Sequence, residues 1–163
     1  MNFEAALSAL ADAGVNFLIV GAYAAYAHGA NQLTQDLDIC YERTPENLKR
    51  LASVMQGLHA TLRGAPENLP FLLDERTLAQ GMNFTLTTDF GDLDLLGELS
   101  GVGQFSELVR DAVSVKLHGT TLRIASLDAI IRSKKAAGRP KDLNALPELE
   151  TLRALKKKGE NQD

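Results

Sequence analysis

Hydrophobic positions recur along the chain with two different periods, and these periods predict short buried strands separated by helices. Residues 4–13 form an amphipathic helical pattern that ends at Gly14. The apolar run 16–20 is rich in strand-forming residues, so we expect a buried strand there. Residues 22–28 favour a helix, and Gly29 follows as its C-terminal cap.

The next part of the chain predicts a second strand followed by a longer helix. Residues 37–41 have the pattern of a strand. Thr44 fits an N-cap and Pro45 fits the first helical position, where a missing N–H costs no intrahelical hydrogen bond. We expect this helix to end near Leu58. The stretch 63–81 has no clear period and is expected to be partly irregular.

Two antiparallel hairpins follow. Residues 83–88 alternate as a strand, and 93–96 return after a turn. Residues 112–117 and 120–125 repeat this arrangement around a second turn. Together with the earlier strands they predict a mixed sheet, because helices intervene between some strands and tight turns between others.

The C-terminal part of the chain predicts two helices. Ser126 fits the N-cap of a helix that runs to about Ala137, and the Gly-Arg-Pro sequence at 138–140 breaks it. A last helix is expected from about residue 141 to about 158. Beyond it, the tail 159–163 is expected to be frayed.

The composition fits one globular domain over residues 1–158, of the α/β or α+β class, with helices flanking a mixed sheet. The chain has 163 residues, of which 45% are hydrophobic. Cys40 is the only cysteine, which excludes an internal disulfide and fits a reducing compartment. The N-terminus lacks a signal-peptide pattern and no apolar run is long enough for a membrane span. We therefore expect a soluble, cytoplasmic protein with no membrane partner.

Charge is unevenly distributed along the sequence. Residues 1–131 hold 8 Lys and Arg against 16 Asp and Glu, whereas residues 132–158 hold 9 against 3. An acidic body with a basic arm is suited to bind metal in one place and a polyanion in another. By charge alone, a solvated C-terminal helix is the favoured interpretation and RNA contact is the alternative.

Two pairs of carboxylates carry the candidate chemistry. Asp36 and Asp38 are two residues apart at the start of a strand, so their side chains share a face. Such a pair repels itself unless a positive group lies between, and a hard cation such as Mg²⁺ takes oxygen ligands. Alone, this pair is more typical of a solvent-facing edge strand. Asp92 and Asp94 repeat the spacing, and two adjacent strands of this kind would form a cluster suited to metal-assisted phosphoryl transfer.

Gly21 adds a second feature, because it lies between a predicted strand and a predicted helix. A glycine at such a junction lets backbone amides approach a phosphate, whose charge the helix N-terminus favours. Many strand–helix junctions contain a glycine for conformational reasons alone, so this feature is unspecific by itself.

Taken in order, these residues resemble the polymerase-β-type nucleotidyltransferase superfamily. The matching features are Gly21-Ala22, His28-Gly29, Thr34, Asp36-Leu37-Asp38, Gly91, Asp94-Leu95-Leu96, Ser126-Leu127-Asp128, Lys134 and Arg139-Pro140-Lys141-Asp142. Within that superfamily the sequence is most similar to the AbiEii-like group of bacterial toxin-related nucleotidyltransferases. The likeness spans roughly residues 15–150 of the chain.

The resemblance implies a nucleotidyltransferase-type mixed sheet and a set of site residues. Mg²⁺ or Mn²⁺ would be held by Asp36, Asp38 and Asp94, with Asp94 as the catalytic carboxylate. Asp94 is preferred to Asp92 because the family's motif has a glycine, one further residue and then Leu-Asp-Leu-Leu. In this chain the glycine of that motif is Gly91, and its aspartate is therefore Asp94. The nucleotide would be bound by Gly21, Ala22, Thr34, Lys134, Arg139 and Asp142.

Two positions depart from the family pattern. Relatives usually have Gly-Ser or Gly-Gly where this chain has Gly21-Ala22, so Ala22 offers no hydroxyl to a phosphate. Many relatives also have an arginine where this chain has Gln32, which loses a bidentate charged donor.

The resemblance implies an enzyme that transfers a nucleotidyl group from a nucleoside triphosphate to a hydroxyl acceptor. The expected acceptors are an RNA or tRNA end or a protein side chain. The resemblance also implies the toxin of a toxin–antitoxin or phage-defence pair, whose partner is an antitoxin protein. Two alternatives stay open: a non-catalytic nucleotide- or partner-binding module on the same fold, and an antitoxin-like protein that binds its partner through the basic C-terminal helix.

Overall fold

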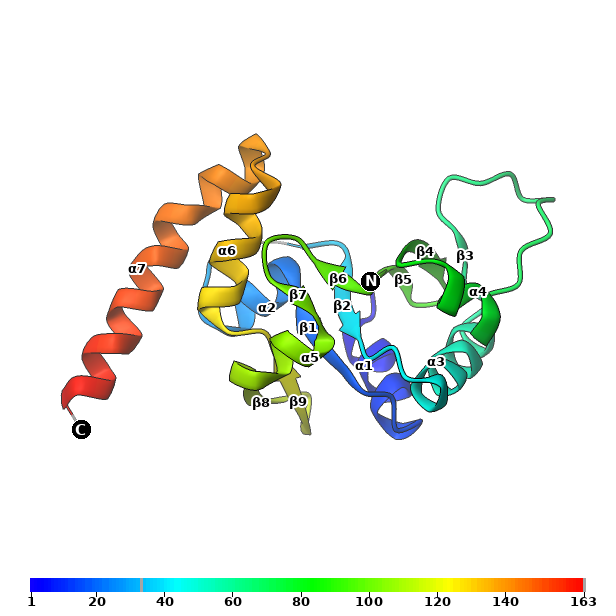
Figure 1. Ribbon diagram of the computed structural model, residues 1–163, viewed down its shortest axis with the longest axis horizontal. Helices are drawn as coiled ribbons and strands as arrows, with labels where there is room; N and C mark the ends of the chain where they lie inside the picture. The colour runs from blue at the N-terminus through cyan, green and yellow to red at the C-terminus, as the bar shows by residue number, and fades with distance from the viewer. Residues whose placement is uncertain (33, 163) are drawn as a thin grey trace.

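A mixed sheet forms the centre of the molecule. The computed structural model describes residues 1–32 and 34–162. Seven strands are arranged in the order β3-β4-β5-β2-β1-β9-β8 (Figure 1). They are β1 (Phe17–Val20), β2 (Leu37–Tyr41), β3 (Thr61–Leu62), β4 (Asn83–Thr88), β5 (Gly91–Leu96), β8 (Val113–Leu117) and β9 (Thr120–Ile124). A separate ribbon pairs β6 (Glu98–Leu99) with β7 (Gly103–Gln104).

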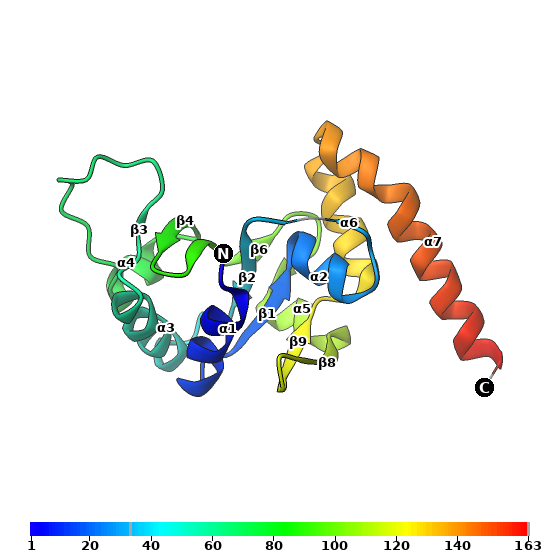
Figure 2. The same cartoon turned by 180° about the vertical axis from the view of Figure 1, so that it is seen from behind.

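Helices lie around this sheet in two groups. The helices are α1 (Phe3–Asp12), α2 (Gly21–Ala27), α3 (Pro45–Gly57), α4 (Glu75–Gln80), α5 (Phe105–Leu108), the 3₁₀ helix η1 (Val109–Asp111), α6 (Leu127–Ala137) and α7 (Pro140–Gln162). Helices α3 and α4 lie beside β3 and β4, whereas α6 and α7 lie on the far side of the molecule next to α2 (Figures 1 and 2). The predicted fold class is therefore confirmed.

The order of parallel and antiparallel pairs follows the connections. Strands β4 and β5, and likewise β8 and β9, are joined by tight turns and pair antiparallel, as the two predicted hairpins require. Strand β2 pairs antiparallel with β1 on one side and parallel with β5 on the other. The parallel contact is reached only after the chain has passed through α3, β3, α4 and β4. This long crossover brings the two acidic strands together.

The predicted helix boundaries hold where capping residues mark them. Thr44 Oγ1 accepts a hydrogen bond from Asn47 N, and Pro45 occupies the first position of α3. Ser126 Oγ accepts from Ala129 N at the start of α6. Gly138 ends α6 in the left-handed conformation, with φ of 65°.

Several elements differ from the prediction. Residues 63–81 contain α4, whose N-cap Asp74 accepts from Thr77 N at 2.8 Å. Strands β3, β6 and β7 have two residues each, too few for a period to show. Helix α7 continues past Lys158, the expected end, to Gln162, with Pro147 inside it. Asp163, in the tail predicted to fray, lies outside the described residues.

The central strands are apolar on the face opposite the acids. All four residues of β1 are buried. Leu37 and Ile39 of β2 are register partners of Leu93 and Leu95 of β5, and all four are fully buried. These leucines and this isoleucine hold β2 against β5, because burial of each such side chain stabilises the fold by about 1.5–3 kcal/mol.

One buried polar side chain fixes the exit of β2. Asn47 is fully buried at the start of α3. Its Oδ1 accepts from Asn16 N at 2.7 Å, and its Nδ2 donates to Asn16 O at 3.0 Å and to Glu42 O at 2.8 Å. Asn47 therefore joins the loop before β1 to the end of β2 and keeps three backbone groups paired.

None of the helices within the described part of the chain is both long and apolar enough to cross a lipid bilayer.

We predict that Asn47→Ala destabilises the protein by about 2–4 kcal/mol, because it leaves three backbone groups without their partner in a buried place. The free energy of unfolding, measured by urea denaturation, tests this. Asn31→Ala is the matched control, since Asn31 is exposed and its backbone N–H, not its side chain, binds Glu148. Equal stability of the two variants would contradict the role given to Asn47.

Candidate active site

The parallel pairing of β2 and β5 sets two carboxylates side by side. Asp38 of β2 is the direct register partner of Asp94 of β5. Asp36 lies just before β2, where its backbone forms a bend rather than a strand. Asp92 lies two residues before Asp94 on β5, so it shares a face with it. The two acidic strands therefore lie side by side, with Asp38 paired to Asp94, whereas Asp36 lies outside the strand on which it was expected to share a face with Asp38.

A cavity of about 510 Å³ opens in front of Asp36 and Asp38. Its wall includes eight of the nine residues expected at the site: Gly21, Ala22, Thr34, Asp36, Asp38, Lys134, Arg139 and Asp142. It also includes Lys141, which the sequence analysis did not assign. The cavity is thus lined both by carboxylates at the start of β2 and by cations from α6, α7 and the residues between them.

Two features require glycine at position 21: the backbone conformation there and the close approach of the Asp38 side chain. Its φ is +68°, in the left-handed region that side chains other than glycine rarely adopt. A Cβ at this position would lie 2.2 Å from Asp38 Oδ2. The glycine therefore leaves room for a carboxylate of its own chain, which is a more specific reason than the turn alone.

Burial and neighbouring charge make the Asp38 carboxyl unusually basic. Desolvation is the main cause, and the adjacent Asp94 adds to it, both by its charge and as a hydrogen-bond partner of the protonated form. Asp36 raises the pKa further, whereas the positive charge of Lys141 lowers it. The result is a pKa of about 7 for Asp38.

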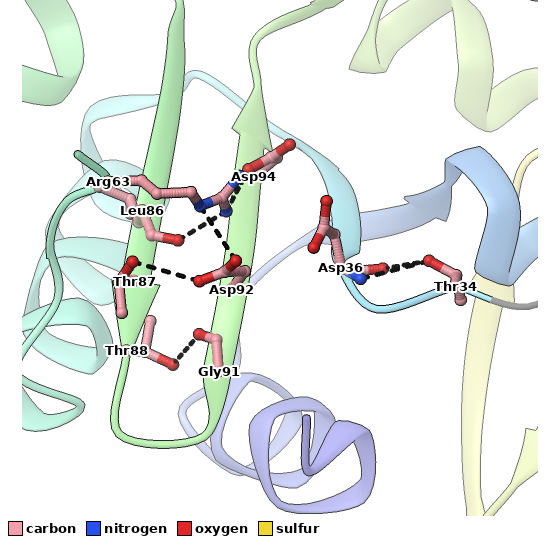
Figure 3. Close-up of polar contacts among 9 residues, drawn as sticks. All are labelled: Thr34, Asp36, Arg63, Leu86, Thr87, Thr88, Gly91, Asp92 and Asp94. Atoms are coloured by element: carbon pink, nitrogen blue, oxygen red, sulfur yellow. Dashed lines mark hydrogen bonds and ion pairs between the residues drawn. The ribbon is translucent and has the colours of Figure 1, made fainter. Parts of the chain in front are cut away.

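Asp94 is not among the residues that line the cavity, and its carboxylate is bound by Arg63. Arg63 Nη2 donates to Asp94 Oδ1 at 2.8 Å and to Leu86 O at 2.8 Å. Figure 3 shows the guanidinium between Asp92 and Asp94, with Asp36 facing the pair across the gap. Arg63 was missed by sequence analysis because it stands in the stretch without a period, next to a strand of two residues.

The carboxylates are not arranged as a finished metal centre. Among residues 1–32 and 34–162, no group of three or more His, Cys, Asp and Glu side chains is placed to hold a metal ion. Arg63 Nη2 lies 2.8 Å from Oδ1 of Asp94, the carboxylate that the resemblance assigns to metal. The donor chemistry nevertheless fits a hard cation, because Asp36, Asp38 and Asp94 offer only oxygen.

Asp142 organises the cationic wall of the cavity. Its carboxylate is almost fully buried and accepts from Arg139 Nε at 2.6 Å and from Arg139 N at 3.2 Å. Lys134 Nζ lies 3.8 Å from Asp142 Oδ1. Burial would raise the pKa of Asp142, but its hydrogen bonds and its ion pair with Arg139 hold the pKa below the ordinary value. Asp142 thus fixes both cations at the break between α6 and α7.

Thr34 shapes the loop before the acids. Its hydroxyl donates to Asp36 O at 2.8 Å and accepts from Asp36 N at 3.3 Å, so it is already engaged within the loop (Figure 3). Gln32 lines the same cavity, at the position where the resemblance led us to expect an arginine.

Comparison with known proteins gives the fold a name. No protein-family model matches the chain, and a search of curated proteins found no match. Among solved structures, a lincosamide antibiotic adenylyltransferase bound to lincomycin is similar over 93% of this chain and 96% of its own, at 11% identity and a TM-score of 0.60.

The antibiotic-resistance factor ANT(2″)-Ia is also similar, over 99% of this chain and 96% of its own, at 15% identity and a TM-score of 0.56. A proposed nucleotidyltransferase from Thermotoga maritima matches over 95% and 90% of the two chains, at 15% identity and a TM-score of 0.51. The chain thus has the fold of these nucleotidyltransferases. The likeness does not single out the AbiEii-like branch.

We predict that Gly21→Ala destabilises the protein by at least about 1 kcal/mol, because alanine strains the left-handed backbone and collides with Asp38. Thermal unfolding measures the loss. Gly57→Ala is the matched control: a Cβ at Gly57, in α3, meets nothing within 4 Å. It is expected to leave stability unchanged or to raise it slightly. The same result for both variants would show that the approach of Asp38 to Gly21 is not a constraint.

We predict that Asp38 makes the metal-free protein less stable as pH rises from about 4 to about 7. Its pKa is 3.8 when unperturbed and about 7 in the folded protein, so in this window only the folded state keeps the proton. Above pH 7 the loss is complete. Asp38→Asn should remove this part of the pH dependence of the unfolding free energy, whereas Asp12→Asn, at an exposed position, should not. Parallel pH curves for the parent and Asp38→Asn would contradict the assignment.

Proposed function

We propose that this protein is a metal-dependent nucleotidyltransferase. The observation that carries the proposal is that the same cavity is lined by two carboxylates, Asp36 and Asp38, and by three cations, Lys134, Arg139 and Lys141. A nucleoside triphosphate with its metal has the matching polarity, because the phosphates seek cations and the metal seeks carboxylates. The shared fold with nucleotidyltransferases supports the same conclusion.

Asp36, Asp38 and Asp94 would hold Mg²⁺ or Mn²⁺. When bound, the metal would neutralise part of the triphosphate charge and favour attack at the α-phosphorus. It would also satisfy the carboxylate that burial now keeps partly protonated, because the charged form of Asp38 gains a counter-ion in place of a proton.

The chain's own residues would bind and orient the reactants. Lys134, Arg139 and Lys141 would hold the phosphates, and Asp142 keeps the first two of these in place. Gly21 and Ala22 present backbone at the cavity wall, where no bulky side chain keeps a phosphate away.

The reaction would form one bond and break one. The acceptor hydroxyl oxygen attacks the α-phosphorus, and the bond from that phosphorus to the β-phosphate oxygen breaks, so that pyrophosphate leaves. Asp94 would take the proton of the hydroxyl, which makes it the catalytic carboxylate. Asp92 has no part in this step.

The acceptor is a hydroxyl compound, and three classes are to be compared. The resemblance favours an RNA or tRNA end or a protein side chain. The structural neighbours include enzymes whose names refer to lincosamide antibiotics and to adenylyl-2″-tobramycin, which makes small antibiotics the third class. A toxin role with an antitoxin partner, and a cytoplasmic location, rest on the resemblance and on the sequence alone.

We predict that Asp94→Asn abolishes transfer of a nucleotide from an α-labelled triphosphate to an acceptor panel of these three classes, at saturating Mg²⁺. Asp92→Asn is the matched control on the same strand and should retain transfer under the same conditions. The Asp94 variant should keep measurable triphosphate affinity, because Asp36 and Asp38 remain. If Asp92→Asn is inactive and Asp94→Asn is active, the prediction is wrong and Asp92 is the catalytic carboxylate.

The same assay separates the competing functions. Mg²⁺-dependent nucleotide binding without transfer to any acceptor would favour a non-catalytic module. Co-purification with a partner protein in the absence of nucleotide, together with no nucleotide binding, would favour the antitoxin-like alternative.

A further inference from the structure

Arg63 stands at the point where the chain leaves the sheet. Its backbone N–H donates to Thr85 O at 3.0 Å, which holds it beside β4. The next residue, Gly64, has φ of +79° and open space around the position of a Cβ. From there the chain runs through a long exposed loop before it returns at α4 (Figure 1). The base of Arg63 is therefore fixed, whereas its head lies among carboxylates that belong to the sheet.

The guanidinium is shared unequally between two carboxylates. It has a full hydrogen bond to Asp94 Oδ1 at 2.8 Å. With Asp92 it forms an ion pair, Nε to Oδ2 at 3.3 Å, but this contact lacks the alignment of a hydrogen bond. Within the described residues this Nε–H is the buried side-chain polar atom that lacks a hydrogen-bond partner. A buried donor without a partner is costly, so the present position of Arg63 is not its best position with respect to Asp92.

A second position is close at hand. A rotation of the guanidinium that aligned Nε with Asp92 Oδ2, now 3.3 Å away, would turn this ion pair into a charge-assisted hydrogen bond. The bond from Nη2 to Leu86 O, at 2.8 Å, lies on the same side of the sheet and would help to hold the head during that movement (Figure 3). Asp92 also accepts from Thr87 Oγ1 at 3.2 Å, so its carboxylate is held in place.

A metal ion on Asp94 would favour that second position. The ion and the guanidinium carry like charge and would lie on the same carboxylate, so they repel each other. Asp92 is a negative group already within ion-pair distance of Arg63, with Oδ2 3.3 Å from Nε.

We propose that Arg63 is an internal counter-ion that passes from Asp94 to Asp92 when the metal binds. This inference rests on the metal site of the proposed function. In the metal-free protein Arg63 offsets the repulsion between Asp38 and Asp94, and Asp92 is the position to which it withdraws. Asp92 thereby gains a role in metal loading although it touches neither metal nor nucleotide. Arg63 and Asp92 are positioning residues, not catalytic ones.

The test is a double-mutant cycle on Mn²⁺ affinity, measured by electron paramagnetic resonance on the full chain without nucleotide. Arg63→Gln removes the competitor and should raise the affinity about tenfold, which corresponds to 1.4 kcal/mol. Asp92→Asn removes the place of withdrawal and should lower the affinity by a similar factor. When it is added to Arg63→Gln, Asp92→Asn should have almost no effect on the affinity, because no arginine remains that could move to Asp92. Arg50→Gln, at an exposed position on α3, controls for loss of one positive charge.

Additive effects in the cycle would overturn the inference, since a simple electric field from Asp92 acts whether or not Arg63 is present. Unchanged affinity in Arg63→Gln would overturn it too. If neither the parent nor Arg63→Gln binds Mn²⁺, both this inference and the proposed metal site are wrong. If the parent protein transfers nucleotide but the effects in the cycle are additive, the inference is wrong and the proposed function stands.

Thermal unfolding shows whether each variant folds. If Arg63→Gln does not fold, the cycle is repeated with Arg63→Lys, which keeps the charge but cannot form the two-point pair. The effect of Asp92→Asn should then also shrink. An undiminished effect in the lysine background would overturn the inference.

Discussion

Repulsion between Asp38 and Asp94 is the constraint on which the rest of this site depends. The two residues are register partners on parallel strands, and the apolar partners on the other face of β2 and β5 hold that register. The chain therefore cannot relieve the repulsion by moving the strands apart without opening its core. It must instead supply compensation locally, and the residues around the pair are explained by that need.

Two different compensations are present on the two sides of the pair. On the cavity side, Asp38 holds its proton up to a pH of about 7, and Lys141 reduces but does not remove that tendency. On the other side, Arg63 pairs with Asp94 directly. A cation bound between the carboxylates would replace both devices at once, which is why an acidic cluster without a finished metal geometry is still consistent with metal binding.

The sequence predicted the acids and the cations of the cavity but not their connections. Periodicity located β2 and β5, and local capping residues located α3 and α6, because these features depend on neighbours in the sequence. Asn47 and Arg63 were not found, since their partners lie 31 residues away or lie on another strand. Gly21 was noticed for a general reason, whereas its specific one, the approach of Asp38, depends on the pairing of β1 with β2.

The structure also explains the uneven distribution of charge along the chain. The acidic body supplies Asp36 and Asp38, and the basic segment, which begins in α6, supplies Lys134, Arg139 and Lys141 to the lining of the same cavity. Asp142 is an acid placed inside this basic segment, and its buried carboxylate forms ion pairs with Arg139 and Lys134 of the same segment. A cavity lined by groups of both charges is suited to a ligand that carries both, such as a triphosphate with its metal.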